Sequence, residues 1–180
     1  MALVDDVAHT LFTEAQIGTR VREIGAAISR DYAGRVPLLV SLLKGALYFM
    51  ADLTRAITIP MTLDFMAITS YGGAQESSGV VRLIKDLDEE ITGRDVILVE
   101  DIIDTGLTAA YLLRTLSARD PASLRICTLL DKTARRIVDN LPIDYRGFEV
   151  PDTFVVGYGL DYRQLYRNLP FIGVLKPEAL

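Results

Sequence analysis

The chain alternates between short apolar runs and longer segments in which apolar residues recur at helical spacing. Three runs lack the polar alternation of a half-exposed strand, which predicts strands buried on both faces, at 37–43, 96–99 and 124–130. Helices are predicted before the first of these strands, at 13–30, and after the first two, at 46–56 and 109–118. Thr13 and Gln16 are spaced as a capping box at the first of these helices. Strands separated by helices predict an α/β fold with a mainly parallel sheet flanked by helices.

The remaining pattern predicts shorter elements. Residues 61–69, 80–85 and 154–157 are rich in β-branched and apolar residues and predict three further strands. A short basic helix is predicted at 133–140. The stretch SYGGAQESSG at 70–79 is too long for a tight hairpin. It is either an exposed loop or a mobile lid that closes over a site and excludes water.

Composition narrows the class of protein. Half of the 180 residues are apolar, which suits one domain with a single core, and the net charge of −5 argues against broad nucleic-acid binding. The single cysteine, Cys127, excludes a disulfide framework or a zinc cluster. No apolar run reaches the roughly 18 residues that span a bilayer. The N-terminus lacks an export signal, so we expect a cytoplasmic protein with no membrane partner.

The stretch Val96–Thr108, VILVEDIIDTGLT, is the main candidate for a site. Its strand is followed by three carboxylates within five residues, Glu100, Asp101 and Asp104, and then by a turn and a helix. In an open α/β sheet, ligands bind at the carboxyl ends of the strands. The unpaired amides and partial positive charge of a helix N-terminus there suit a phosphate.

The turn Thr105–Thr108 contains a glycine, two hydroxyls and free amides, enough to wrap one phosphate. The carboxylates would repel that phosphate, so they suit sugar hydroxyls or a hard cation such as magnesium. Together these features describe a site for a phosphorylated ribose. The alternative is a solvated acidic loop in which Asp104 or Thr105 is an ordinary N-cap.

Two lysines also follow predicted strands. Lys44 precedes Gly45 and the second helix, and Lys132 follows the strand at 124–130. Each is either a surface cation or part of a site at the carboxyl edge of the sheet; Lys132 could donate to an exocyclic oxygen. His9, the only histidine, lies in the terminal segment without visible orienting partners, so we assign it no catalytic role.

VILVEDIIDTGLT resembles the phosphoribosyl-diphosphate-binding motif of type I phosphoribosyltransferases. SLLKGALYF, ITSYGG, LLDK and PDTFVVGYGLDYRQLYRNLPFIGVL match in order and narrow the resemblance to the hypoxanthine-guanine branch of the purine enzymes. The resemblance implies one phosphoribosyltransferase domain over 1–180, with a small hood subdomain built from the N-terminal and C-terminal segments. It also implies that the loop at 70–79 is mobile and that the protein is a homodimer or homotetramer.

The resemblance implies an activity in purine salvage. Phosphoribose is transferred from phosphoribosyl diphosphate to hypoxanthine or guanine, giving IMP or GMP and pyrophosphate, with magnesium as cofactor. The residues implied for the ribose 5-phosphate are Glu100, Asp101, Asp104, Thr105, Gly106, Leu107 and Thr108. Those implied for pyrophosphate are Leu43, Lys44, Gly45, Ser70, Tyr71 and Arg167. Those implied for the purine are Lys132, Phe154, Val155 and Asp161. One or two magnesium ions are implied at Glu100, Asp101 and Asp161.

In the family, the residue at Asp104 is the general base for the purine ring nitrogen, and the lysine at Lys132 contacts the six-position oxygen. The matching peptide at Leu43–Lys44 is cis. Without the resemblance, Asp161 and Arg167 would be interpreted as surface charges and Phe154 as a core aromatic. Leu107 departs from the many relatives that carry Lys or Arg there, so we expect some loss of charge attraction for phosphate.

Three other functions stay open. A xanthine- or guanine-preferring transferase differs from this interpretation only in the purine contacts. A nucleotide-sensing RNA-binding regulator of the same fold would need a basic RNA-facing patch, which the acidic balance disfavours. A non-catalytic nucleotide-binding module would have lost Asp104 or the carboxylate pair, and all three carboxylates are present.

Overall fold

The computed structural model describes residues 3–70 and 81–179. Its main sheet has six strands in the order β4-β3-β2-β5-β6-β7. They are β2 (Leu38–Leu42), β3 (Thr62–Ser70), β4 (Val81–Lys85), β5 (Asp95–Ile103), β6 (Ser123–Asp131) and β7 (Ile143–Glu149). Only the β3–β4 pair, at one edge, is antiparallel. The predicted mainly parallel α/β sheet is therefore confirmed.

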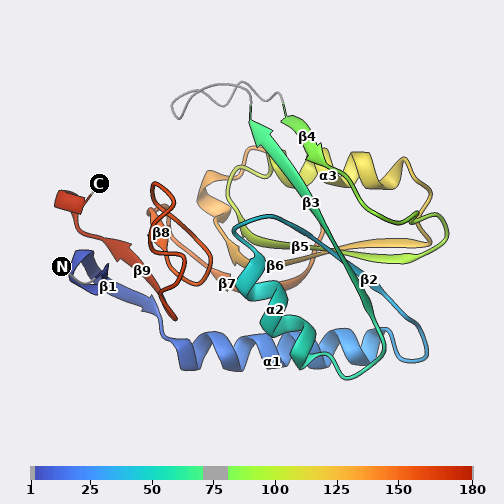
Figure 1. The fold of residues 1–180 in the computed structure, drawn as a ribbon, viewed down its shortest axis with the longest axis horizontal. Helices are drawn as coiled ribbons and strands as arrows, with labels where there is room; N and C mark the ends of the chain where they lie inside the picture. Colours follow the sequence, from blue (N-terminus) through green and yellow to red (C-terminus); the bar gives the residue numbers. More distant parts are fainter. Residues whose placement is uncertain (1–2, 71–80, 180) are drawn as a thin grey trace.

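Helices cover both faces of this sheet (Figure 1). The helices α1 (Glu14–Asp31) and α2 (Leu47–Ala56) pack on one face, and α3 (Leu107–Ser117) packs on the other. In β5, Ile97 and Val99 face the first two helices, while Val96 and Leu98 face α3, and all four are fully buried. This burial on both faces explains why the strand reads as a continuous apolar run.

A second, antiparallel sheet joins the two ends of the chain. It has the order β1-β9-β8, from β1 (Val7–Phe12), β9 (Ile172–Leu175) and β8 (Val155–Val156). Figure 1 shows it beside the main sheet, with both termini at its outer end. Short 3-10 turns flank it at Leu3–Asp6 and Pro177–Ala179. This sheet is built from the segments that were expected to form the hood.

Several predicted boundaries were wrong. The short helix expected at 133–140 is only a 3-10 turn, Thr133–Arg135, because the following residues extend and donate their amides elsewhere. Strand β5 runs on past Val99 to Ile103, since its ladder with β6 continues through Glu100 and Ile102. Strand β1 was not predicted, and β7 was expected only as part of a loop-and-strand segment between Pro142 and Pro151. Their mixed patterns, VAHTLF and IDYRGFE, lack a clean period of two.

Two smaller expectations are confirmed. Thr13 caps α1 in a capping box: its side chain accepts from the Gln16 amide, and the Gln16 side chain accepts from the Thr13 amide. Cys127 is fully buried in β6, and burial raises the pKa of its thiol.

Among the described residues, no helix combines the length and apolar character needed to cross a bilayer.

Candidate active site

A cavity of about 260 Å³ opens at the carboxyl ends of β2 and β5. Its lining joins the strand ends to the start of α3 and comprises Leu42, Leu43, Gly45, Glu100, Asp101, Ile102, Ile103, Asp104, Thr105, Gly106, Thr108 and Ala109. Every residue predicted for the ribose 5-phosphate lines it except Leu107, which is 39% exposed. The volume is close to the lower end of ordinary ligand sites and suits a small, polar ligand.

The predicted phosphate loop ends at the first turn of α3. Gly106 is the N-cap, with φ +84, and no side chain caps the helix. The alternative in which Asp104 or Thr105 is the N-cap is therefore wrong. Thr105 Oγ1 accepts only a long hydrogen bond from the Leu107 amide, at 3.4 Å. The loop thus presents backbone amides and hydroxyls to the cavity without a competing cap.

Glu100 and Asp101 sit on β5 rather than on a loop. The Glu100 side chain is 4% exposed, and its Oε1 has no hydrogen-bond partner among the described residues. Burial raises its pKa well above the ordinary value, and neighbouring Asp101 adds to the rise. Burial likewise raises the pKa of Asp101, opposed by the Ile102 amide, which donates to Oδ1 at 2.8 Å. Carboxylates with raised pKa values lining one cavity are typical of a functional site.

Asp104 lies between the phosphate loop and two cations. Its Oδ2 is 3.6 Å from Lys132 Nζ and 3.6 Å from Arg135 Nη1. Its Oδ1 is buried and has no hydrogen-bond partner within the described chain. Lys132 is 5% exposed, so the interpretation as a surface cation is wrong. Asp104 therefore keeps one acceptor free while its other oxygen is held by cations.

Arg135 was missed by sequence reasoning. Its Nε lies 3.5 Å from Asp152 Oδ1, and Asp152 precedes Phe154 in the loop that leads into β8. The same guanidinium reaches Asp104, so it joins the two sides of the site. The only available signal was its place three residues after Lys132 in a run of basic residues.

Of the residues predicted for pyrophosphate, Leu43 and Gly45 line this cavity, and Arg167 is connected to Gly45 through Gly159. The Leu43–Lys44 peptide is cis, as the resemblance implied. Gly45 is required, because a Cβ there would come within 1.8 Å of Asp101 Oδ2. Gly159, with φ +102, packs directly on the Gly45 carbonyl, since its own Cβ would lie 2.0 Å from that oxygen. The two loops therefore touch backbone to backbone.

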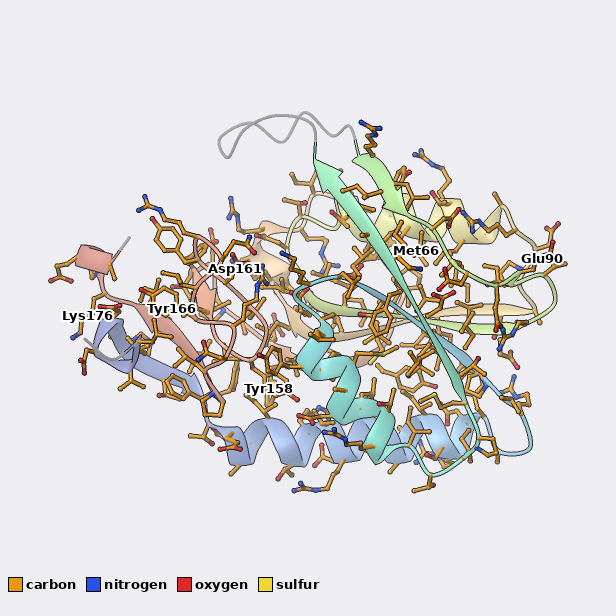
Figure 2. The ribbon with its side chains drawn as sticks, in the orientation of Figure 1. Met66, Glu90, Tyr158, Asp161, Tyr166 and Lys176 are labelled. Carbon is orange, nitrogen blue, oxygen red and sulfur yellow. The ribbon has the colours of Figure 1, made fainter. Side chains whose placement is uncertain are left out.

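Asp161 and Arg167 are not isolated surface charges. Arg167 Nη2 pairs with Asp161 Oδ1 at 2.7 Å, and Arg167 Nη1 donates to the Gly159 carbonyl at 2.7 Å. Figure 2 shows Asp161 in the loops that follow β8, on the side of the small sheet towards the main sheet. The pair is thereby tied to the Gly45 loop through Gly159.

On the purine side, Phe154 is 46% exposed and meets the Tyr162 ring edge-on at 5.6 Å. Its exposure excludes the core-aromatic interpretation and leaves a ring face free for stacking. Val155 is buried in β8 and pairs with Val174.

The expected lid falls outside the described residues. Ser70 ends β3, and Tyr71 with the rest of the loop is not described. His9 is exposed on β1.

Protein groups do not form a closed metal site in the described chain. No cluster of three or more acidic, histidine or cysteine side chains there could hold an ion alone. The unpartnered Glu100 oxygen and the Asp101 carboxylate nevertheless suit a hard cation. Magnesium typically binds through one or two carboxylates together with substrate phosphates, and these residues fit that mode.

Comparison with known proteins agrees with this geometry. A model of the phosphoribosyl transferase domain matches residues 4–163. The hypoxanthine-guanine phosphoribosyltransferase of Bacillus subtilis is 51% identical over 174 residues, covering 97% of this chain and 96% of that protein. The Mycobacterium tuberculosis protein of the same name is 49% identical, covering 97% of this chain and 89% of the relative.

Solved structures give the same result. A hypoxanthine phosphoribosyltransferase from Staphylococcus aureus has a TM-score of 0.94 and 46% identity, covering 98% of this chain and 95% of that one. The family model spans most of the chain, and the relatives span nearly all of it. The chain belongs to the phosphoribosyltransferase family.

Proposed function

We propose that the protein transfers phosphoribose from phosphoribosyl diphosphate to hypoxanthine, and to guanine, in purine salvage. One observation carries the proposal. Asp104, whose side chain is 38% exposed, lines the same cavity as an uncapped phosphate loop, and the buried Lys132 lies beside its carboxylate. A proton acceptor, a phosphate cradle and a donor for an exocyclic oxygen are the parts that this reaction needs.

Asp104 acts as the general base. Its carboxylate, which lines the cavity, accepts the proton from the purine ring nitrogen as that nitrogen attacks the anomeric carbon. The sugar passes through an oxocarbenium-like state, and pyrophosphate leaves from the opposite face. Lys132 donates to the six-position oxygen of the base. Adenine carries an amino group at that position, so the Lys132 ammonium and the adenine amino group would both be donors and could not form a hydrogen bond.

The sugar end is held by the strand and the loop. Amides and hydroxyls of Asp104 to Thr108 bind the 5-phosphate at the start of α3. Glu100 and Asp101 face the ribose hydroxyls. Their raised pKa values favour carboxyl groups that are protonated or bound to a cation, and both forms can lie next to the hydroxyl oxygens of the ribose. The exposed Phe154 ring stacks on the purine, and the Val155 backbone hydrogen-bonds its edge.

Pyrophosphate is bound at the touching loops of Leu43–Gly45 and Gly159. Arg167 suits a diphosphate because its planar guanidinium can donate two parallel hydrogen bonds. To do so it exchanges its present partner Asp161 for phosphate oxygens. Ser70 and Tyr71 stay candidates from the sequence.

Magnesium is the cofactor of this proposal, and one or two ions would be held at Glu100, Asp101 and Asp161 together with substrate oxygens. When bound, magnesium would neutralise charge on the departing pyrophosphate. A cytoplasmic location and a homodimer or homotetramer belong to the same proposal.

The test measures nucleotide formation from phosphoribosyl diphosphate and magnesium with hypoxanthine, guanine, xanthine and adenine in parallel. We expect rapid product with hypoxanthine, product with guanine, and little with adenine. Faster product with xanthine or guanine than with hypoxanthine would favour a transferase of different preference. Absence of product with every purine would contradict the proposal, and salt-dependent RNA retention in a filter assay would then favour a regulator.

A further inference from the structure

The phosphate loop contains no cation of its own. Residues 104–108 are Asp-Thr-Gly-Leu-Thr, and the nearby cations Lys132 and Arg135 pair with two carboxylates, those of Asp104 and Asp152, which leaves that group with no net charge. A phosphomonoester carries up to two negative charges near neutral pH. The backbone amides alone must therefore offset the repulsion between the phosphate and the Asp104 carboxylate, unless a positively charged side chain of another element lies next to the loop.

Another segment supports the loop from behind. The Thr105 carbonyl accepts two hydrogen bonds, from the Ile137 amide at 2.9 Å and from the Val138 amide at 3.2 Å. A Cβ on Gly106 would lie 2.9 Å from Arg136 Cδ and 3.2 Å from Val138 Cβ. The extended residues after the 3-10 turn thus pack against the backbone of the loop, and Arg136 lies directly under Gly106.

Arg136 is itself held from the end of β6. Its Nη2 forms an ion pair with Asp131 Oδ1, and Asp131 is fully buried. Arg146 Nε lies 2.9 Å from the other oxygen, Asp131 Oδ2. One carboxylate therefore faces two guanidiniums, and the trio carries one net positive charge. Asp131 holds Arg136 in place within the protein, whereas Arg146 is 47% exposed, so solvent and salt screen its charge.

Two buried polar atoms of this trio, Asp131 Oδ2 and the donor Arg136 Nε, make no hydrogen bond within the described chain. Arg136 Nε lies 3.6 Å from the position that a Cβ on Gly106 would take. The Arg136 side chain is only 15% exposed, so its charge is screened less than that of a surface arginine.

We propose that Arg136, fixed by Asp131, is a positioning residue for the 5-phosphate of the sugar substrate. It holds the Thr105–Gly106 backbone in the shape that aims the amides, and it supplies the positive charge that the loop lacks. This inference rests on the proposed function for the identity of the substrate. The ligand is a phosphomonoester dianion on a pentose. Arg136 contacts the backbone of the phosphate loop and not the reacting atoms.

The test compares Arg136→Met with Arg146→Met, which removes the same charge from the other oxygen of Asp131. Steady-state kinetics and calorimetric titration with ribose 5-phosphate are measured on both. For Arg136→Met we expect the KM for phosphoribosyl diphosphate and the Kd for ribose 5-phosphate to rise about tenfold, the size of one charge-assisted interaction. The KM for hypoxanthine stays within about twofold, and Arg146→Met changes each value by less than about twofold.

An unchanged Kd in Arg136→Met, or an equal rise in Arg146→Met, would overturn the inference. If Arg136→Met lacks a cooperative melting transition, Arg136→Lys replaces it. Lysine keeps the charge and loses the planar contact, so we expect a rise of about threefold, and no rise would overturn the inference. If the unmodified protein binds ribose 5-phosphate but makes no nucleotide, the proposed function fails, while the comparison of the two arginines still decides this inference.

Discussion

Carboxylates at the two ends of the main-sheet strands differ in their hydrogen bonding. We call the side where the parallel strands begin the amino-terminal edge and the side where they end the carboxyl-terminal edge. At the amino-terminal edge, Asp31 accepts from the Tyr145 hydroxyl at 2.9 Å and from Arg125 at 3.3 Å. Asp95, at the start of β5, accepts from Ser123 and from Arg35. At the carboxyl-terminal edge, Glu100 Oε1 and Asp104 Oδ1 are buried without a hydrogen-bond partner in the described chain.

This difference in hydrogen bonding suggests that the carboxylates of one edge stabilise the fold and those of the other edge serve the function. Buried polar groups are normally satisfied, and each one that is not costs free energy of folding. The carboxylates of the amino-terminal edge follow that rule, although the Tyr32 hydroxyl there is buried without a hydrogen-bond partner in the described chain and its ring contacts Arg35 and Arg125. Under the proposed function, a ligand would complete the unsatisfied oxygens of the carboxyl-terminal edge. The same strand, β5, carries Asp95 at one end and Glu100 near the other.

The largest effect is expected for Asp104→Asn. The change removes the proton acceptor but keeps the shape, so kcat should fall about 10²- to 10⁴-fold while the KM for phosphoribosyl diphosphate stays nearly constant. Steady-state kinetics and thermal melting check it. The matched variant Asp95→Asn should instead lower the melting temperature with kcat unchanged. Asp104→Asn with a near-normal rate would contradict the assignment of the base.

Tyr145→Phe tests the amino-terminal edge. The hydroxyl donates to Asp31 and accepts from Arg125 at 2.9 Å, and the residue is 6% exposed. Its loss should lower the free energy of unfolding by about 1–2 kcal/mol, measured in urea, without changing kcat or either KM. A fall in kcat with unaltered stability would mean that the two edges are not separated in function.

Glu100→Gln should make the protein more stable, and the gain should grow with pH. The raised pKa means that, above about pH 4.5, the unfolded chain loses its proton before the folded chain does. Stability of the unmodified protein therefore falls as pH rises towards the folded pKa. Glutamine removes that loss, so the melting temperature of the variant should exceed the parent's more at pH 8 than at pH 5.

The control for this variant is Glu90→Gln, at an exposed position far from the cavity (Figure 2). It should shift the melting temperature by the same small amount at each pH. A gain in Glu100→Gln that does not vary with pH would contradict the role of burial. Nucleotide formation by Glu100→Gln should fall, because the carboxylate no longer faces the ribose hydroxyls.

The smallest effect is expected for Arg135→Met. The side chain is half-exposed and its two ion pairs are long, so each is worth about 1 kcal/mol or less. Because the pairs join Asp104 to the Phe154 loop, the KM for hypoxanthine should rise about threefold with the melting temperature unchanged. Arg55→Met, on α2, is the control. Equal kinetics in both variants would show that the bridge does not act on the purine.

The α/β class, the buried strands and the place of the candidate site could be predicted from the order of apolar and polar residues alone. These follow from local rules: β5 is apolar because both its faces are covered, and Gly106 marks a turn that only glycine adopts easily. The carboxylates Glu100, Asp101 and Asp104 could be named from their place after a buried strand. The roles of Phe154, Asp161 and Arg167 came only from the family resemblance.

The ion pairs of the site could be identified only from the folded structure. Asp131 and Arg136 are neighbours in sequence, yet Arg146 joins them from β7 and Gly106 from the loop before α3. Residues 133–140 have a helical composition, but the amides of Ile137 and Val138 donate to the Thr105 carbonyl instead of continuing a helix. Such pairings join segments far apart in the chain, and their energies depend on burial, which no local pattern encodes.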